Sequence, residues 1–387
     1  MMKNIRVSLR MTSHPMYRDL IKYPPDGIIY NIPKMATTVK DSTLIIKLKK
    51  KIWIEYTKFI PPSISIVVGK NDLIHSTFGT MVKNKFSWVV DVEHVAAFSN
   101  FHTDKMKNKW YKKEIIKLLS SDYCKKIMPW SYACKKSIDS YCNSNKISKK
   151  MEVVYPAIQS RKKKRYRKTN VITLIYVSRY FFEKGGNQVL EAFKRLDKKY
   201  DIRLLVLSRA PSEIKEAYKD FKNIKFVDKD FFNTNSMDEL FNNYYMKSDI
   251  MVFPSFMDTF GGSLLEAMSC GLPVVTTNIF AIPEIVQDNY NGFLVNTPLS
   301  LYNKKDYSIK WGQKTNRWKE FCNLTKTVNS IFVENIVEKI SQLIENVSIM
   351  KKFGKNGWNE INSGKFSIKE RNKKLKKIYE EAIGGKN

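Results

Sequence analysis

The sequence has no apolar run long enough to cross a bilayer. A membrane-spanning helix needs about 18 or more consecutive apolar residues, and no stretch of the 387-residue chain approaches that length. The N-terminus also lacks the apolar core of a secretory signal peptide. We therefore expect a protein that stays in the cytoplasm, with membrane contact limited to peripheral attachment.

Cysteine is scarce and its spacing is uninformative. The five cysteines are odd in number and show no paired spacing of the kind that binds a metal ion. We expect reduced, packed thiols and no metal site. Asp228-Lys229-Asp230 is the one acidic triplet that could suggest a metal, but it follows a predicted strand and has no supporting ligands. The prediction is therefore no metal and no cofactor.

Acidic residues are few, and their shortage is uneven. The chain has 37 Asp and Glu against 68 Lys and Arg, a net charge of +31. Residues 1–158 hold 28 basic and 12 acidic residues, and residues 171–365 hold 26 and 22. The excess in the first half predicts one basic partner surface, which an anionic membrane would fit. Lysine enrichment from an AT-rich genome is the alternative source.

A basic run, RKKKRYRK at 161–168, separates the two halves. Such a run between apolar patterns is typical of a solvated linker, here assigned to residues 159–170. A nuclear-localisation or nucleic-acid patch is the sharper interpretation. We do not favour a nucleic-acid partner, because the motifs described below account for the rest of the chain.

Composition and pattern indicate two α/β domains. Hydrophobic residues make up 43% of the chain and aromatic residues 13%, enough for two cores. Short apolar runs alternate with amphipathic stretches, which predicts doubly wound parallel sheets. The predicted strands of the first half are 5–9, 28–32, 73–75, 88–93, 126–128 and 152–155, with helices at 105–121 and 132–142. The second half has predicted strands at 171–177, 204–207, 224–227, 250–253 and 273–277, with helices at 187–196, 212–221, 237–247, 263–269, 333–347, 349–361 and 366–383.

The most informative stretch is PSFMDTFGGSLLEAMSCGLPVV, residues 254–275. It reads as a loop and a helix between two strands, so its acids Asp258 and Glu266 fall at the carboxyl end of a parallel sheet, where ligands bind. The glycine pair Gly261-Gly262 lets backbone N–H groups approach an anion, and the following helix N-terminus favours one. A carboxylate there can accept hydrogen bonds from sugar hydroxyls. Together these features suit a phosphate flanked by sugars.

Both acids also have structural interpretations. Ser263 and Glu266 have capping-box spacing, so Glu266 could cap its own helix. Asp258 could be an ordinary acid beside a turn. A second loop bears on the choice, because Arg179 and Lys184 follow the strand 171–177 and precede a glycine pair. A loop with two cations and two glycines can bind a pyrophosphate, and a pair of surface cations is the alternative.

These two motifs together resemble the signatures of family 4 of the retaining glycosyltransferases. The first signature is Glu, seven residues, Glu, then Ala-Met and Gly-x-Pro-Val-Val, and the chain matches it with Asp258 in place of the first Glu. The second is Gly-Arg, four residues, Lys-Gly, matched with Ser178 in place of the glycine. The resemblance covers residues 150–387 closely and residues 1–150 only in pattern. Residues 10–15, RMTSHP, replace the glycine-rich loop that such enzymes carry after the first strand.

The resemblance implies a GT-B fold, with two Rossmann-like doubly wound domains facing a cleft. Residues 1–158 would bind the acceptor, residues 171–365 would bind the nucleotide-sugar donor, and helix 366–387 would pack back on the first domain. The catalytic assignment is Arg179 and Lys184 on the donor diphosphate and Asp258 on the donor sugar. The remaining donor-binding residues would be Thr259, Phe260, Gly261, Gly262, Ser263 and Glu266. His75, Glu93 and His94 are polar residues at the ends of predicted strands, and they could contact the acceptor or donor sugar or simply lie in solvated turns. Related transferases often carry a histidine at the position of Glu93 or His94.

The implied activity is retaining transfer of a sugar from a nucleotide-diphospho-sugar to an acceptor, for which a membrane-associated lipid or glycan is one candidate. Two alternatives stay open. One is another GT-B enzyme, such as a sugar-nucleotide epimerase or a phosphorylase. The other is a basic nucleic-acid-binding protein on a degenerate transferase scaffold. Residues 299–330 match no element of the family and read as an insertion.

Overall fold

The computed structural model describes residues 4–10, 15–32, 44–161, 171–228, 237–312 and 316–384. The chain divides into two compact units. The first unit comprises residues 1–157, 303–318 and 368–387, and the second comprises residues 158–302 and 319–367. No helix in the described part of the chain is both long and apolar enough to span a membrane.

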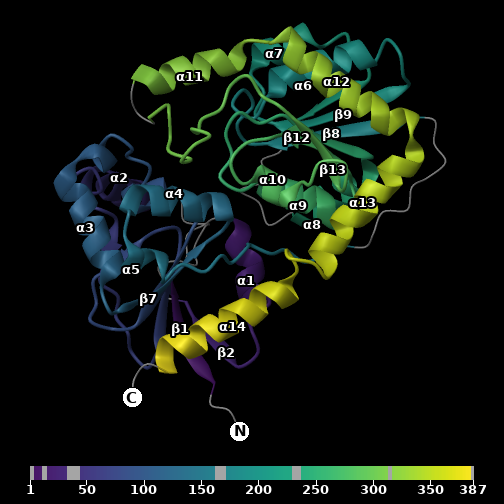
Figure 1. The fold of residues 1–387 in the computed structure, drawn as a ribbon. Helices are drawn as coiled ribbons and strands as arrows, with labels where there is room; N and C mark the ends of the chain where they lie inside the picture. The colour runs from purple at the N-terminus through teal and green to yellow at the C-terminus, as the bar shows by residue number, and fades with distance from the viewer. Residues whose placement is uncertain are drawn as a thin grey trace. The chain divides into compact units, whose positions relative to one another are not determined.

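The first unit is built on a five-stranded parallel sheet in the order β2-β1-β4-β6-β7 (Figure 1). Its strands are β2 (Ile28–Asn31), β1 (Ile5–Arg10), β4 (Leu73–Ser76), β6 (Trp88–Val92) and β7 (Cys124–Pro129). All five residues of β6 are buried, as expected for a central strand covered on both faces. A small separate sheet pairs β3 (Ser63–Ile64) with β5 (Met81–Val82).

Helices cover this sheet and connect its strands. They are α1 (Arg18–Lys22), α2 (Leu44–Tyr56), α3 (Lys109–Ser120), α4 (Tyr132–Cys142), α5 (Asn145–Ser148) and α14 (Ile368–Gly384), with 3-10 turns η1 (Pro15–Tyr17), η3 (Val95–Ser99) and η4 (Lys105–Lys107). The side chain of Ser131 accepts from the N–H of Cys134 and so starts α4 at the predicted place. The last helix, α14, packs against the first unit and contacts β4 and β7.

The second unit has a six-stranded parallel sheet in the order β10-β9-β8-β11-β12-β13. The strands are β10 (Ile224–Val227), β9 (Ile202–Ser208), β8 (Ile172–Ser178), β11 (Ile250–Phe253), β12 (Val274–Thr277) and β13 (Gly292–Val295). When the strands of this unit are numbered from 1 in chain order, their order in the sheet is 3-2-1-4-5-6, the arrangement of dinucleotide-binding sheets. The strand order reverses between β8 and β11, which pair directly.

The helices of the second unit follow the strands in alternation. They are α6 (Gly186–Leu196), α7 (Ser212–Ala217), α8 (Met237–Asn243), α9 (Gly262–Ser269), α10 (Ile282–Ile285), α11 (Asn316–Lys326), α12 (Ser330–Glu345) and α13 (Val347–Asn362), with the 3-10 turn η5 (Tyr245–Lys247). Seven of the eleven residues of α6 are buried, since its apolar positions recur at helical spacing along one face.

Several predicted elements differ from the structure. Residues 152–155 form no strand, although Met151 makes an isolated bridge to Ile127. The helix predicted at 212–221 ends at Ala217. Helix α2 was not predicted, because three consecutive lysines interrupt its apolar pattern. Within the region read as an insertion, residues 303–318 cluster with the first unit, and α11 occupies Asn316–Lys326.

Candidate functional site

The candidate site lies where the strand order of the second sheet reverses. Ligands of open α/β sheets bind outside the carboxyl ends of the strands at this position. The loop after β8 carries Arg179 and Lys184, and the loop after β11 carries Asp258 and the glycine pair. Because β8 and β11 are neighbours, the sheet brings together the two motifs that the sequence separates by about 80 residues.

Lys184 and Asp258 join the two loops. The Nζ atom of Lys184 lies 2.7 Å from Oδ2 of Asp258 and also donates to the carbonyl oxygen of Met257. Both side chains of this ion pair are 13% exposed, so the pair is largely shielded from water yet reachable. The backbone N–H of Phe256 reinforces the contact by donating to the carbonyl of Glu183. Cation and carboxylate therefore form one fixed polar cluster.

Two glycines make this close approach possible. Gly185 has φ +80°, and a Cβ there would lie 2.2 Å from the carbonyl oxygen of Pro254. Any other residue would push the two loops apart. Gly261 has φ +102°, in the left-handed region that side chains rarely adopt, and it is the N-cap of α9.

The start of α9 supplies backbone donors beside the cluster. The first N–H groups of a helix have no acceptor within the helix. Asp258 holds the backbone just before these groups in place, because its Oδ1 accepts a hydrogen bond from the N–H of Phe260 at 3.0 Å. Helix α9 begins at Gly262 with Gly261 as N-cap and no side-chain cap. Ser263 is therefore not the N-cap, and the capping-box interpretation of Glu266 is wrong.

Glu266 instead accepts a hydrogen bond from a tyrosine. The hydroxyl of Tyr245, on η5, donates to Oε2 of Glu266 at 2.9 Å. Burial raises the pKa of Tyr245 well above its ordinary value, and the neighbouring Glu266 carboxylate raises it further. Tyr245 thus stays a neutral donor that orients the glutamate. This partner lies 21 residues away and could not be found from the sequence.

The other predicted donor-binding residues lie on the same two loops. Arg179 directly follows β8 and is half-buried. Thr259, Gly262 and Ser263 are also half-buried, and Phe260 is buried. Two threonines of β12 fix the start of the loop after β11. The hydroxyl of Thr276 donates to the carbonyl of Phe253, and that of Thr277 donates to the carbonyl of Ser255.

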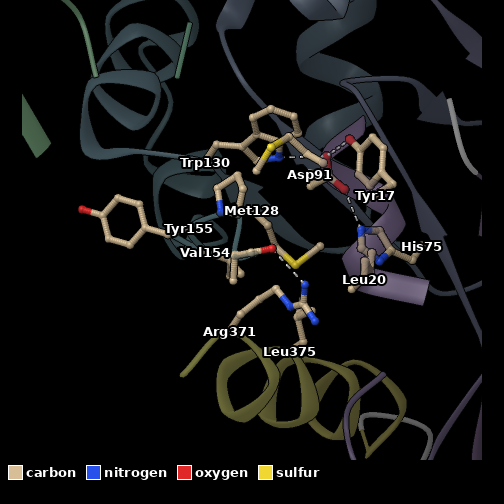
Figure 2. A pocket seen from close by; sticks show the side chains of 13 residues that line it. Tyr17, Leu20, His75, Asp91, Met128, Trp130, Val154, Tyr155, Arg371 and Leu375 are labelled. Carbon is tan, nitrogen blue, oxygen red and sulfur yellow. Dashed lines mark hydrogen bonds and ion pairs between the residues drawn. The ribbon is translucent and has the colours of Figure 1, made fainter. Parts of the chain in front are cut away.

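His75, predicted to contact substrate, lies in a buried hydrogen-bond network of the first unit. Its Nε2 is 2.9 Å from Oδ2 of Asp91, and its Nδ1 is 2.7 Å from the hydroxyl of Tyr379 on α14. Asp91 also accepts from the Tyr17 hydroxyl and the Trp130 indole N–H. Figure 2 shows this network along one wall of a pocket. Both ring nitrogens of His75 thus have partners within the protein, and contact of His75 with substrate stays a prediction.

Glu93 and His94, at the end of β6, are also buried. The backbone N–H of Ala96 donates to Nδ1 of His94, and Nε2 lies 2.8 Å from the carbonyl oxygen of Tyr307. Since Nδ1 is an acceptor, Nε2 carries the proton and donates it. Burial lowers the pKa of His94 to about 4. Tyr307, which lies in the segment read as an insertion, therefore covers this histidine, and substrate would reach it only if Tyr307 moved.

Arg10 ends β1, where the strand order of the first sheet reverses between β1 and β4. Its guanidinium lies over the Trp53 ring, with Cζ 5.6 Å from the ring centroid. Within the described residues, its buried Nη1 has no hydrogen-bond partner. Burial lowers the pKa of Arg10 to about 10, so the group stays charged at neutral pH. The sequence singled out Arg10 to His14 only as polar residues, and Met11 to His14 lie outside the described residues.

Acidic residues do not gather into a metal site. Asp228 pairs with Lys215, and Asp230 lies outside the described residues. Over the described ranges, no group of three or more His, Cys, Asp or Glu side chains could hold a metal ion. The absence of a metal requirement stays a prediction.

A part of the chain that includes most of the second unit matches a known family. Residues 158–320 match the family described as glycosyl transferases group 1. An uncharacterized glycosyltransferase of Methanocaldococcus jannaschii, MJ1178, is 24% identical over 328 residues, 81% of this chain and 78% of the relative. The N-acetyl-alpha-D-glucosaminyl L-malate synthase of Bacillus anthracis is 32% identical, over 31% of each chain. These matches support the group 1 resemblance, and family 4 in particular stays a prediction.

Solved structures match the chain over nearly its whole length. Sucrose-phosphate synthase of Thermosynechococcus elongatus superposes with a TM-score of 0.64, covering 98% of this chain and all of that one, at 12% identity. The Anabaena protein Alr3699/HepE, in complex with UDP and glucose, has a TM-score of 0.60 at 12% identity and covers 96% and 98%. The predicted GT-B fold with two Rossmann-like domains is confirmed.

Proposed function

We propose, from the match of residues 158–320 to the group 1 glycosyl transferases, that the protein is a retaining glycosyltransferase. It would move a sugar from a nucleotide-diphospho-sugar to an acceptor bound by the first unit. The observation that carries this proposal is the cluster of Lys184, Asp258 and the α9 N-terminus at the reversal point of the second sheet.

The cluster has capacity left for a donor. A lysine ammonium has three N–H donors, and two of those of Lys184 are taken by Asp258 and Met257. The third can reach a diphosphate oxygen. Within the described residues, each carboxylate oxygen of Asp258 accepts one hydrogen bond and has a further lone pair, which a sugar hydroxyl can use. The ion pair need not break for the donor to bind.

The proposed chemistry needs no protein nucleophile. The acceptor oxygen attacks the anomeric carbon as the bond to the diphosphate oxygen breaks, and the departing phosphate takes the acceptor's proton on the same face. Charge then develops on that phosphate. Arg179, Lys184 and the backbone amides of Gly261 and Gly262 would stabilise it, which is usually the largest contribution to such catalysis. The N–H of Phe260 is not counted, because it already donates to Asp258. Glu266 would hold the ribose hydroxyls.

Two further features bear on the substrates. The Anabaena protein of similar fold binds UDP and glucose, which supports a nucleotide-sugar donor. The Nη1 atom of Arg10 has no hydrogen-bond partner among the described residues, and residues 1–158 carry a basic excess. Both features support an anionic or membrane-linked acceptor. The basic run at 161–168 would add to such membrane attachment, and residues 162–168 lie outside the described part. Arg161 is described and pairs with Asp238.

The decisive experiment measures donor binding and turnover with UDP-, GDP- and ADP-sugars, then the anomeric configuration of the product by NMR. Arg179→Ala and Lys184→Ala should each lower turnover by about 10²–10³ while the protein stays folded. Near-wild-type turnover in a folded Arg179→Ala variant would remove the diphosphate role. An inverted product would contradict retention, and conversion of the donor without acceptor would indicate an epimerase.

A further inference from the structure

Helix α2 of the first unit exposes a row of large apolar side chains. Leu48 is 58% exposed, Ile52 is 59% exposed and Tyr56 is 37% exposed. These residues are four apart, so they lie above one another on one face of the helix. Phe59, in the turn that follows, is 71% exposed and falls within the same sector at helical spacing. We call these four residues the α2 stripe.

The opposite side of α2 is fixed to the unit. Thr57, directly after the helix, is fully buried, and its carbonyl accepts from the Tyr111 hydroxyl of α3 at 2.9 Å. The Thr57 hydroxyl accepts from the side chain of Asn100 at 3.2 Å. Trp53 stacks on Tyr56 and lies beside Arg10. These contacts set which face of α2 is turned outward, and Figure 1 shows the helix on the outside of its unit beside α3.

The sequence around the stripe is rich in lysine. Residues 44–60 contain five lysines, at positions 47, 49, 50, 51 and 58, and a single acid, Glu55. Glu55 is neutralised by Lys58, whose Nζ lies 2.6 Å from its carboxylate. Lys51 is exposed next to Ile52. An apolar face bordered by lysines is the pattern of a helix that lies in the plane of a membrane surface.

The beginning of α3, which is bonded to the end of α2, also carries exposed residues of this kind. Trp110 is 52% exposed and directly precedes Tyr111, the residue bonded to the end of α2. Exposed Lys109 and Lys113 flank it. Tryptophan and lysine side chains are favoured at the headgroup level of a bilayer, where one end of the side chain is apolar and the other is in water.

We propose that the α2 stripe and Trp110 dock the first unit on an anionic lipid bilayer, with the stripe inserted among the headgroups. The positive charge near the stripe distinguishes between two possible partners of this surface, a second copy of the chain and a lipid bilayer. A second copy of this chain would bring the same basic rim against itself, whereas an anionic leaflet complements it. Apolar contact and lysine attraction act together here, as reversible surface binding requires. The inference deepens the membrane-linked acceptor of the proposed function and rests on it.

Co-sedimentation with vesicles tests the proposal in the full-length protein. The vesicles are phosphatidylcholine alone or with 30 mol% phosphatidylglycerol. Wild type should bind only the anionic vesicles and leave them at high salt. Leu48→Ser with Ile52→Ser should lower the partition coefficient by at least about tenfold. The matched control is Ile331→Ser with Val347→Ser, which removes two exposed apolar residues of the second unit and should change nothing.

Charge is tested separately. Lys51→Gln with Lys109→Gln should weaken binding by roughly 25-fold, about fivefold for each lysine near the surface. Lys351→Gln with Lys352→Gln, two exposed lysines of α13, should leave it unchanged. Equal binding to neutral and anionic vesicles, or unaltered binding of the stripe variant, would overturn the proposal. So would a wild-type dimer that the stripe variant converts to monomer without any vesicle binding.

Donor affinity separates this inference from the proposed function. Each variant is titrated with the nucleotide-sugar that wild type binds. The stripe and lysine variants should keep wild-type donor affinity, because their residues lie in the first unit. Vesicle binding without any donor binding would sink the glycosyltransferase proposal and leave the docking surface standing. If the protein binds donor, and the stripe variants bind vesicles as well as wild type does, the docking surface is wrong and the glycosyltransferase proposal stands.

Discussion

At the scale of single residues, the proposed donor site depends on side chains whose partners come from distant parts of the chain. Lys184 and Asp258 were predicted to bind different parts of the donor, and the structure pairs them with each other. The pair fixes both loops before any ligand arrives, so little rearrangement is needed at the moment of reaction. Glu266 and Tyr245 form a second such pair on the same side of the sheet.

The Glu266–Tyr245 pair gives a direct test of the ribose role. Glu266→Gln should weaken donor binding by about 1.5–3 kcal/mol, the value of hydrogen bonds to a charged group. Its thermal stability should fall little, because a glutamine oxygen still accepts from Tyr245. Calorimetric titration with the donor and a melting curve measure both quantities.

Tyr245→Phe is the control for that variant. It removes the orienting hydroxyl but leaves the Glu266 charge in place, so donor affinity should fall less than in Glu266→Gln. If Glu266→Gln melted at a lower temperature yet bound donor as wild type does, Glu266 would be a structural residue.

His94 predicts a pH dependence of stability. Its pKa is about 4 in the folded chain and near 6.5 when exposed. The unfolded chain therefore binds a proton first as the pH falls. The stabilising contribution is complete above pH 6.5 and is lost progressively toward pH 4, at a total cost of about 3 kcal/mol. Urea unfolding at pH 7.5, 5.5 and 4.5 measures this loss.

The comparison variant is His94→Gln, whose amide can still donate to the Tyr307 carbonyl but does not titrate. The difference in unfolding free energy between wild type and His94→Gln should shrink as the pH falls from 7.5 to 4.5. A difference that stays constant over this range would mean that His94 is not buried in its neutral form.

At the scale of elements, Asp91 ties together four parts of the first unit. Its carboxylate accepts from Tyr17 on η1, His75 on β4, Trp130 after β7 and the backbone N–H of Phe78. Phe78 has φ +58°, an uncommon conformation for a bulky residue, and this contact helps to hold it. Through Tyr379 the network also reaches α14.

Asp91→Asn should therefore destabilise the first unit strongly. An amide nitrogen cannot accept from the donors that face it, so at least one buried donor loses its partner. The expected loss is about 3 kcal/mol, which corresponds to a fall in melting temperature of roughly 6–12 °C for a domain of this size. Asp122→Asn is the control, since Asp122 is exposed and its pair with Lys146 should contribute little. Equal melting temperatures for the two variants would contradict a structural role for the network.

The elements also show what the sequence could reveal. Strand 250–253, the loop with its glycine pair and the helix after it were predicted nearly as they occur, because glycine and proline positions and apolar runs are local signals. Helix α2 was missed because its stripe faces outward among lysines rather than into a core. The cover over His94 was missed as well, since it depends on Tyr307, more than 200 residues away.

At the scale of the whole molecule, the two sheets divide the proposed reaction between them. Each sheet reverses its strand order once, and each reversal point carries a different set of groups. The second sheet presents an internally balanced cation and carboxylate, together with helix amides. The first presents Arg10, for which the described residues provide no carboxylate. The uneven charge of the two halves follows the same division.

This division predicts that Arg10 acts on the acceptor and not on the donor. Arg10→Gln should lower kcat/KM for transfer to the acceptors of a cell membrane fraction by about 10- to 100-fold, the value of hydrogen bonds between a charged group and an anion. Donor affinity, measured by titration, should stay within about twofold of wild type.

Arg10→Lys is the control variant. It keeps the charge but loses the planar pair of donors, so its transfer rate should lie between those of wild type and Arg10→Gln. The melting temperature of Arg10→Gln should not fall, because removing a buried cation without a carboxylate relieves a desolvation cost. Weaker donor binding in Arg10→Gln, with transfer per bound donor unchanged, would place the guanidinium on the donor and refute the division.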